Sequence, residues 1–201
     1  MLNKNFENNR RRKQELKGRP IADEIYKKVF GQEILIERFE REENYQLDLI
    51  FAMDVKIVMP IGLILVGQEK FLSYENKKYQ SITVEYMQNP VIGERGDWFK
   101  LAVQFYFTAY FNEPETCFDL WVLTNWMNVV LCTMDNKIMW KSGANTRTNA
   151  RANFKYCNMY QLPAHCIIAS SWSNKIHGDV LRLALFDECM ENRYKEDLSH
   201  G

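Results

Sequence analysis

Apolar and polar residues alternate along residues 47–59, and this is the clearest pattern in the sequence. Every odd-numbered position from 47 to 59 is apolar, whereas Asp48, Asp54 and Lys56 stand at even-numbered positions. Alternation with a period of two over such a length predicts a β-strand with one buried face.

A hairpin turn follows this strand. Pro60-Ile61-Gly62 separates it from a second apolar run, LILVGQEKFL at 63–72. A three-residue loop that starts with Pro and ends with Gly is typical of a tight connection between antiparallel strands. If the strands flank this loop symmetrically, the numbers of paired residues add up to 122, and Asp54 lies opposite Gln68.

The remaining patterns predict an α/β domain with a central mixed sheet of four or five strands flanked by helices. Residues 20–30 begin with Pro20 and precede Gly31, which predicts a short helix. Residues 33–41 fit a strand or a continuation of that helix, and 81–87 fit a third strand in or beside the hairpin. The long apolar segment 98–111 predicts a core helix. The other predicted elements are a strand at 118–123, a short helix through Trp126 and Val130, a polar loop at 142–153, strands at 154–159 and 165–170, and an amphipathic helix at 179–192.

The composition indicates a folded protein, and its net charge of zero excludes the binding of nucleic acid through overall positive charge alone. Hydrophobic residues make up 46% of the chain, and 26 basic side chains balance 26 acidic ones. The charge is uneven, because residues 1–19 carry seven basic and two acidic side chains. We interpret 1–19 as a flexible basic arm and 20–201 as one domain. Candidate phosphate contacts are Arg10, Arg11, Arg12 and Lys13 of the arm, and Arg147, Arg151 and Lys155 near the polar loop.

The cysteines and the apolar runs indicate a reducing, cytoplasmic location. Five cysteines without regular spacing do not predict a disulfide framework. Buried free thiols are favoured over a zinc site formed by Cys157, His165 and Cys166. No apolar run reaches the roughly 20 residues that span a bilayer, so no membrane association is expected.

Three polar residues of the predicted hairpin have the chemistry of a metal-dependent hydrolase. Asp54 faces Gln68, and Lys70 follows on the same face of the strand. A carboxylate and a second oxygen ligand can share a divalent cation, and a neighbouring ammonium can orient a water for attack on a phosphodiester. The simpler alternative is a half-buried sheet in which Lys70 only pairs with Asp54.

Asp54 followed by Gln68-Glu69-Lys70 resembles the D…(D/E/Q)-x-K motif of the PD-(D/E)XK, or restriction-endonuclease-like, nucleases. The resemblance implies an αβββαβ core, Mg²⁺ or Mn²⁺ as cofactor, and DNA as substrate. It implies a metal-binding Asp54, a metal ligand at Gln68 and a catalytic Lys70. The small size and single-domain layout of the chain are similar to those of phage or mobile-element nucleases of replication, recombination or repair. Such an enzyme would act in the host cytoplasm.

The neutral Gln68 requires a second carboxylate from elsewhere. Glu85 on the adjoining strand is the first candidate, and the resemblance implies an acid on the first helix, for which Glu24 and Asp23 compete. Glu69 points to the opposite face unless a bulge near Gly67 reverses it. The alternative function is a non-catalytic DNA-binding or assembly protein on a decayed nuclease fold. A homodimer is compatible with either function.

Overall fold

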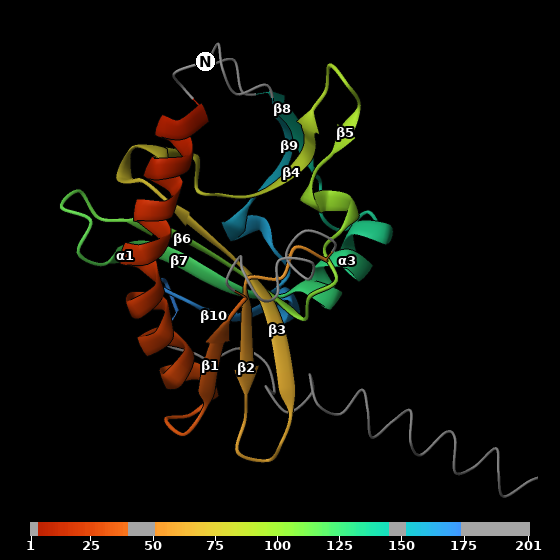
Figure 1. Cartoon of the computed structure of the whole chain (residues 1–201). Helices are drawn as coiled ribbons and strands as arrows, with labels where there is room; N and C mark the ends of the chain where they lie inside the picture. Colours follow the sequence, from red (N-terminus) through yellow and green to blue (C-terminus); the bar gives the residue numbers. More distant parts are fainter. Residues whose placement is uncertain (1–3, 40–50, 145–151, 174–201) are drawn as a thin grey trace, which may run out of the picture.

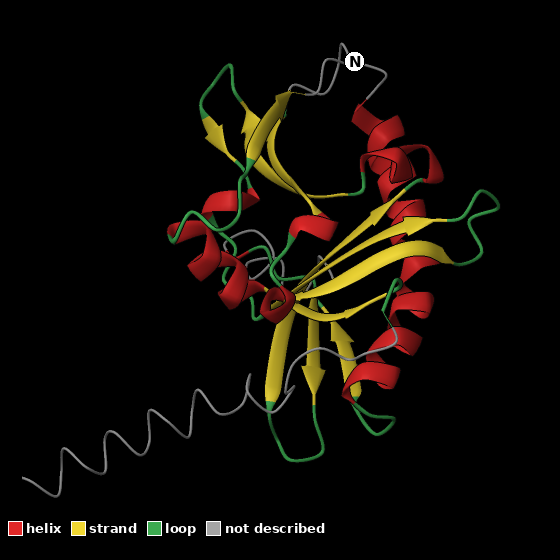
Figure 2. Ribbon diagram, turned by 180° about the vertical axis from the view of Figure 1, so that it is seen from behind, coloured by secondary structure: helices red, strands yellow, loops and turns green. Residues whose placement is uncertain are grey.

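Two β-sheets form the framework of the protein, and a long helix covers one of them (Figures 1 and 2). The computed structural model describes residues 4–39, 51–144 and 152–173. Within these ranges the helical elements are α1 (Lys4–Phe30), α3 (Trp126–Met134) and the 3-10 segments η1 (Tyr74–Tyr79), η2 (Asp97–Phe99), η3 (Met159–Gln161) and η4 (Ala164–Cys166). The strands are β1 (Leu35–Arg38), β2 (Val55–Val58), β3 (Ile64–Leu72), β4 (Ser81–Asn89), β5 (Glu94–Arg95), β6 (Phe105–Phe111), β7 (Phe118–Asn125), β8 (Lys141–Ala144), β9 (Asn153–Asn158) and β10 (Ile167–Ser170).

The larger sheet has six strands in the order β1-β2-β3-β6-β7-β10. β3 and β6 are parallel, and the other neighbouring strands are antiparallel. Parallel neighbours need a long crossover, and here the chain forms η1, β4, β5 and η2 between β3 and β6. β4 and β5 belong to the smaller, antiparallel sheet, whose order is β5-β4-β9-β8.

Different parts of the chain cover the two faces of the larger sheet. α1 packs on one face through Tyr26 and Phe30, which contact Phe107 of β6 and its apolar neighbours. Tyr106 and Tyr110 alternate with these residues along β6 and face the other side, where α3 and β4 contribute to a second apolar cluster. The central strands are therefore buried on both faces.

α1 begins at Lys4, well before the predicted start at residue 20, and Pro20 lies inside it. The proline removes one backbone hydrogen bond, but packing stabilises the helix on both sides of it. A Cβ on Gly18 would lie 2.7 Å from the ring of Phe71, so the helix lies directly on β3 at this point. The buried positions recur every four residues, at Gly18, Ala22, Tyr26 and Phe30. From Lys4 onwards, the residues of the predicted arm belong to this helix.

The prediction of a core helix at 98–111 is wrong, because the second half of the segment forms β6. All seven residues of β6 are buried. A strand that is covered on both faces has no polar alternation, and its sequence is an unbroken apolar run that resembles a buried helix. The polar residues Lys100 and Gln104 precede the strand.

The predicted hairpin and its register are confirmed. Val55 pairs with Gly67 and Val58 with Ile64, so the numbers of the partners add up to 122. β2 begins at Val55 rather than at residue 47, and residues 47–50 lie outside the described ranges. Residues 81–87 form a strand as predicted, but β4 joins the smaller sheet and does not pair with the hairpin.

Most of the other predicted elements are confirmed. Segment 33–41 contains β1 and not a continued helix, and β7, α3, β9 and β10 lie where their patterns predicted them. The loop predicted at 142–153 is wrong at its start, because Gly143 belongs to β8 and pairs with Phe154. The rest of that loop, at 145–151, and the predicted helix at 179–192 lie outside the described residues. No helix in the described part of the chain has both the length and the hydropathy that a membrane crossing requires.

A polar network on the α1 side connects the helix to the hairpin. Arg38 donates from Nε to Glu69 Oε2 at 3.0 Å and from Nη2 to Asp23. The hydroxyl of Tyr26 donates to Glu69 Oε1 at 2.9 Å. Burial raises the pKa of Glu69, and the Arg38 guanidinium opposes that rise. Arg38 is therefore the main reason that a carboxylate is tolerated under α1.

Replacing Arg38 with Met should lower the free energy of unfolding by about 3 kcal/mol near neutral pH, because a buried carboxylate loses its partner. Without Arg38 the pKa of Glu69 in the folded protein rises further. When the pH falls below that pKa, the buried carboxylate takes up a proton and its unpaired charge disappears. We therefore expect the deficit to shrink at mildly acidic pH in urea unfolding. The double variant Arg38→Met/Glu69→Leu should recover most of the loss. A deficit of equal size at neutral and acidic pH would contradict this account.

Candidate active site

Three polar side chains from neighbouring strands form a row on the face of the larger sheet that is turned away from α1. Gln68 of β3 pairs with Tyr106 of β6 in the parallel ladder. On the other side of Gln68, Asp54 stands just before β2, and its N–H donates to the carbonyl of Gly67 at 2.9 Å, one residue out of the register of the hairpin. Val55, the first residue of β2, packs on the α1 side. Gln68 and Tyr106 alternate with residues that face α1 and so lie on the opposite side of the sheet, and the negative charge of Asp54 acts on Tyr106 there.

The backbone holds the Asp54 carboxylate against β3. Its Oδ2 accepts a hydrogen bond from the N–H of Glu69 at 2.9 Å, which places it beside the segment that joins Gln68 to Lys70. Two residues earlier, the buried Ala52 has a positive φ of 49°. Residues with a Cβ are strained in this conformation, and such strain is concentrated at functional sites.

Gln68 presents a buried oxygen that has no hydrogen-bond partner among the described residues. The same holds for Oγ1 of Thr108, which stands next to Lys70 in the ladder. Nε2 of Gln14 and Oγ of Ser170, elsewhere in the described chain, are also buried without a partner. Buried polar atoms are almost always paired, so the Oε1 of Gln68 is an acceptor that a ligand could use.

Lys70 is fixed at the junction of the two sheets. Its Nζ donates to the carbonyl of Thr83 in β4 at 3.1 Å, and the hydroxyl of Tyr106 donates to the same carbonyl at 2.9 Å. Further along β4, the hydroxyl of Tyr110 donates to the carbonyl of Ser81 at 2.6 Å and accepts from its N–H at 3.1 Å. Side chains of the larger sheet thus bind the edge of β4 that is not paired with β9.

Two more acidic residues, Glu85 and Asp97, lie in the crossover between β3 and β6. Burial raises the pKa of Tyr106 well above its usual value, and negative charge from Asp97, Asp54 and Glu85 raises it further. Gly96 brings Asp97 against β4, since a Cβ at this glycine would lie 2.5 Å from the carbonyl oxygen of Glu85. The oxygens of these acids do not all lie within 4.8 Å of one another, so the cluster is wider than a closed metal cage.

The other predicted acids lie on the far side of the larger sheet. Glu69 points towards α1, because β3 pairs with β2 and β6 in a regular register without a bulge. Asp23 pairs with Arg38 on that side. Glu24 is 73% exposed on α1 and pairs with Lys27 at 2.9 Å. Neither Glu24 nor Asp23 is brought to the row.

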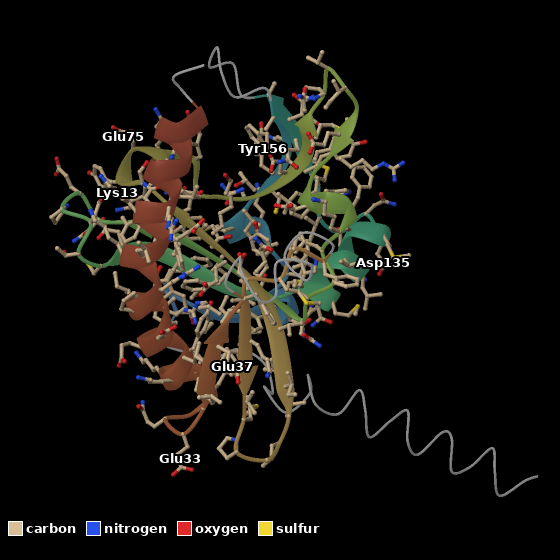
Figure 3. All side chains as sticks on the ribbon, in the orientation of Figure 1. Lys13, Glu33, Glu37, Glu75, Asp135 and Tyr156 are labelled. Atoms are coloured by element: carbon tan, nitrogen blue, oxygen red, sulfur yellow. The ribbon has the colours of Figure 1, made fainter. Side chains whose placement is uncertain are left out.

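The predicted phosphate contacts are spread over the molecule. Arg12 and Lys13 are exposed on α1 (Figure 3), and this helix covers the opposite face from the row. Lys155 of β9 lies closer, because β9 pairs with β4, and its Nζ is 4.9 Å from the ring centre of Tyr86. Arg10 and Arg11 belong to the first part of α1, and Arg147 and Arg151 lie outside the described residues.

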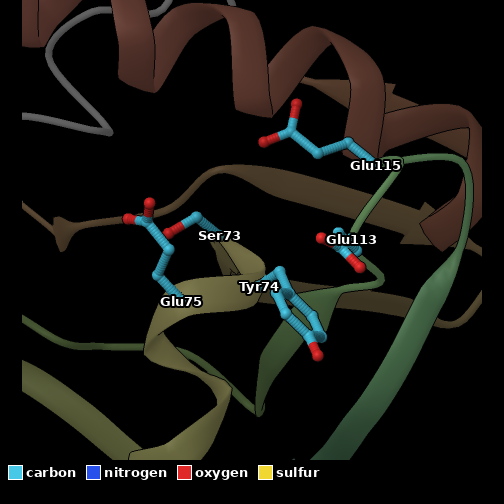
Figure 4. A pocket seen from close by; sticks show the side chains of 5 residues that line it. All are labelled: Ser73, Tyr74, Glu75, Glu113 and Glu115. Atoms are coloured by element: carbon cyan, nitrogen blue, oxygen red, sulfur yellow. The ribbon is translucent and has the colours of Figure 1, made fainter.

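A pocket of about 210 Å³ opens beyond the carboxyl end of β3 (Figure 4). Its lining consists of Ser73, Tyr74, Glu75, Glu113 and Glu115. The lining holds three carboxylates, of which Glu115 pairs with Lys17 of α1 at 2.5 Å, and no basic residue belongs to the lining itself. The excess of acidic groups disfavours the binding of a phosphodiester there.

Asp97 and Tyr106 are site residues that the sequence did not reveal. Asp97 follows a turn-rich stretch, and only the packing of the preceding Gly96 against Glu85 brings it beside β4. Tyr106 stands inside an apolar run that predicted a helix. The available signal was the hydroxyl group itself, because a polar tip within a core segment requires a partner.

Comparison with known protein families, with curated proteins and with solved structures finds no match to this chain. The assignment of a function therefore depends on the geometry of the site.

The docking of β4 predicts different costs for two conservative substitutions. Tyr110→Phe removes the partner of both the N–H and the carbonyl of Ser81, and should lower the free energy of unfolding by about 2–3 kcal/mol. Tyr106→Phe should cost about 1 kcal/mol, because Lys70 remains on the carbonyl of Thr83. Denaturant unfolding of the two variants measures both values. An equal or larger cost for Tyr106→Phe would contradict the shared role of Lys70.

Proposed function

We propose that the protein is a divalent-metal-dependent nuclease that hydrolyses DNA phosphodiester bonds. The observation that carries this proposal is the row formed by Asp54 and Gln68 with Lys70 beside it, on one face of a hairpin that is followed by a parallel strand. These are the three residues of the motif that resembles the PD-(D/E)XK nucleases.

The order of the elements supports the same family. A helix, three antiparallel strands and then a strand parallel to the third correspond to α1, β1, β2, β3 and β6. This is the αβββαβ order with one difference. The crossover between the last two strands contains β4 and β5 instead of a long helix. Glu85 of β4 and Asp97 of η2 belong to this crossover.

The residues at the site fit a small divalent cation such as Mg²⁺ or Mn²⁺. Asp54 offers a carboxylate, and Gln68 offers a buried oxygen that lacks a partner in the described structure. Mg²⁺ keeps several of its waters in protein sites, so Glu85 and Asp97 would act on it through water. Their charges compensate for the neutral amide of Gln68.

Hydrolysis adds a water oxygen to phosphorus, breaks one P–O ester bond and delivers a proton to the leaving alkoxide. A bound divalent cation supplies an activated water and polarises the phosphoryl oxygens. Asp54 and Gln68 would hold the cation, and Glu69 would orient Asp54 through its N–H. Lys70 would orient the attacking water and stabilise negative charge that develops at the phosphate. Tyr106 positions Lys70 by sharing the carbonyl of Thr83 with it.

Lys70→Ala should lower the rate of DNA cleavage by about 10²–10³-fold while Mn²⁺ binding persists, because the ammonium acts on water and phosphate rather than on the cation. The measurement is the loss of a supercoiled plasmid with Mg²⁺ and with Mn²⁺. Lys56→Ala is the matched control, since Lys56 lies on the same hairpin and pairs with the exposed Glu37 at 2.8 Å. The proposed site is wrong if Lys70→Ala keeps full metal-dependent activity.

Titration calorimetry with Mn²⁺ tests the ligands separately from the chemistry. The wild-type protein should bind Mn²⁺, Asp54→Asn should lose that binding, and Gln68→Glu should strengthen it because a carboxylate replaces a neutral amide. Glu24→Gln should change nothing, since Glu24 lies on the far side of the sheet. A wild-type protein that binds no Mn²⁺ and cleaves no DNA would favour the non-catalytic alternative.

A further inference from the structure

Two cysteines and a histidine meet at the second apolar cluster, to which Cys132 and Cys166 belong. Cys132 lies in α3, and His165 and Cys166 belong to η4, just before β10. Sγ of Cys132 is 3.0 Å from Nε2 of His165 and 3.7 Å from Sγ of Cys166. The three ligand atoms all lie within 4.8 Å of one another. In the described part of the chain, no other set of three or more Cys, His, Asp or Glu side chains comes together in this way.

The geometry is close to that of a tetrahedral zinc centre. With Zn–S distances of about 2.3 Å, two thiolates of one zinc ion are about 3.8 Å apart, and a thiolate and an imidazole nitrogen are about 3.6 Å apart. The observed separation of the sulfurs agrees with the first value. The sulfur and nitrogen are closer than the second value and would have to separate by about half an ångström, which the exposed His165 allows.

The surroundings hold the three residues together before any ion binds. Asn128 of α3 donates from Nδ2 to the carbonyl of His165 at 2.7 Å and so connects the helix to η4. Cys132 is 3% exposed and Cys166 is fully buried. His165 is exposed, and thus provides the side from which an ion and a fourth, exchangeable ligand can enter.

Two other uses of these residues fit less well. A Cys–His nucleophile must reach its substrate, and Cys132 is buried. A disulfide requires sulfurs about 2.05 Å apart, so Cys132 and Cys166 would have to approach considerably. Neither use explains why the imidazole nitrogen and both sulfurs converge.

We infer that Cys132, His165 and Cys166 form a zinc-binding site with three protein ligands that connects α3 to the start of β10. On binding, each thiol releases its proton and coordinates as a thiolate, and the neutral imidazole contributes Nε2. The site is independent of the proposed nuclease activity, because it lies outside the row of Asp54, Gln68 and Tyr106.

The first test is the zinc content of the full-length protein, purified under reducing conditions and dialysed against zinc and then against metal-free buffer. Elemental analysis should find one zinc per chain. His165→Ala, which changes an exposed residue, should weaken zinc binding by about 100-fold or more. Cys132→Ser and Cys166→Ser should lose the metal. Cys117→Ser is the matched control, because Cys117 is an exposed free thiol outside the group, and it should keep the zinc.

Replacement of zinc by Co²⁺ in the wild-type protein tests the ligands without a mutation. Thiolate ligands should produce an intense sulfur-to-cobalt charge-transfer band, and His165→Ala should shift the visible spectrum. Three results would overturn the assignment: wild-type protein without zinc after loading, a metal that stays equally tight in His165→Ala, or a disulfide between Cys132 and Cys166 in the reduced preparation.

Discussion

The contact between the edge of β4 and the side chains of Tyr106, Tyr110 and Lys70 is the interaction on which the arrangement of the site depends. These side chains bind backbone groups that no neighbouring strand pairs. Buried backbone groups without partners would cost several kcal/mol together, so β4 is held firmly at this place. The position of β4 also sets the place of Glu85, and the charges of Glu85 and of Asp97 in the following turn act on Tyr106.

The two faces of β3 carry separate electrostatic systems. On one face, Glu69 is neutralised by Arg38 under α1, and its charge is used locally. On the other face, Gln68 and Lys70 experience the negative charge of Asp54 and of the acidic residues in the crossover. Because a strand alternates strictly, three consecutive residues serve both systems without competing. The buried ion pair also opposes any shift of β3 by one residue, which would bring Glu69 out of reach of its partner.

The sequence was sufficient to predict the hairpin, but not to predict the elements that pack on it. Alternation and a Pro-to-Gly loop determine the register that pairs Val55 with Gly67 and Val58 with Ile64, and these are local properties. β6 was mistaken for a helix because burial on both faces removes the alternation. Asp97 was missed because it reaches the site only through the crossover, and Cys132 was missed because its partners are distant in sequence. A buried cluster on elements that are not neighbours in the chain has no periodic signal.

The construction of the hairpin has a consequence for insertions and deletions. The turn between β2 and β3 lies at the end of the hairpin remote from Asp54, and Ile61 in it is exposed. Residues added there can loop out and leave the paired strands as they are. A single residue inserted between Asp54 and Val58, by contrast, would turn the side chains on the Asp54 side of the insertion to the opposite face of the sheet. The Asp54 carboxylate would then point towards α1. Related chains can therefore differ in the length of this turn, whereas the intervals from the turn to each motif residue must keep their parity.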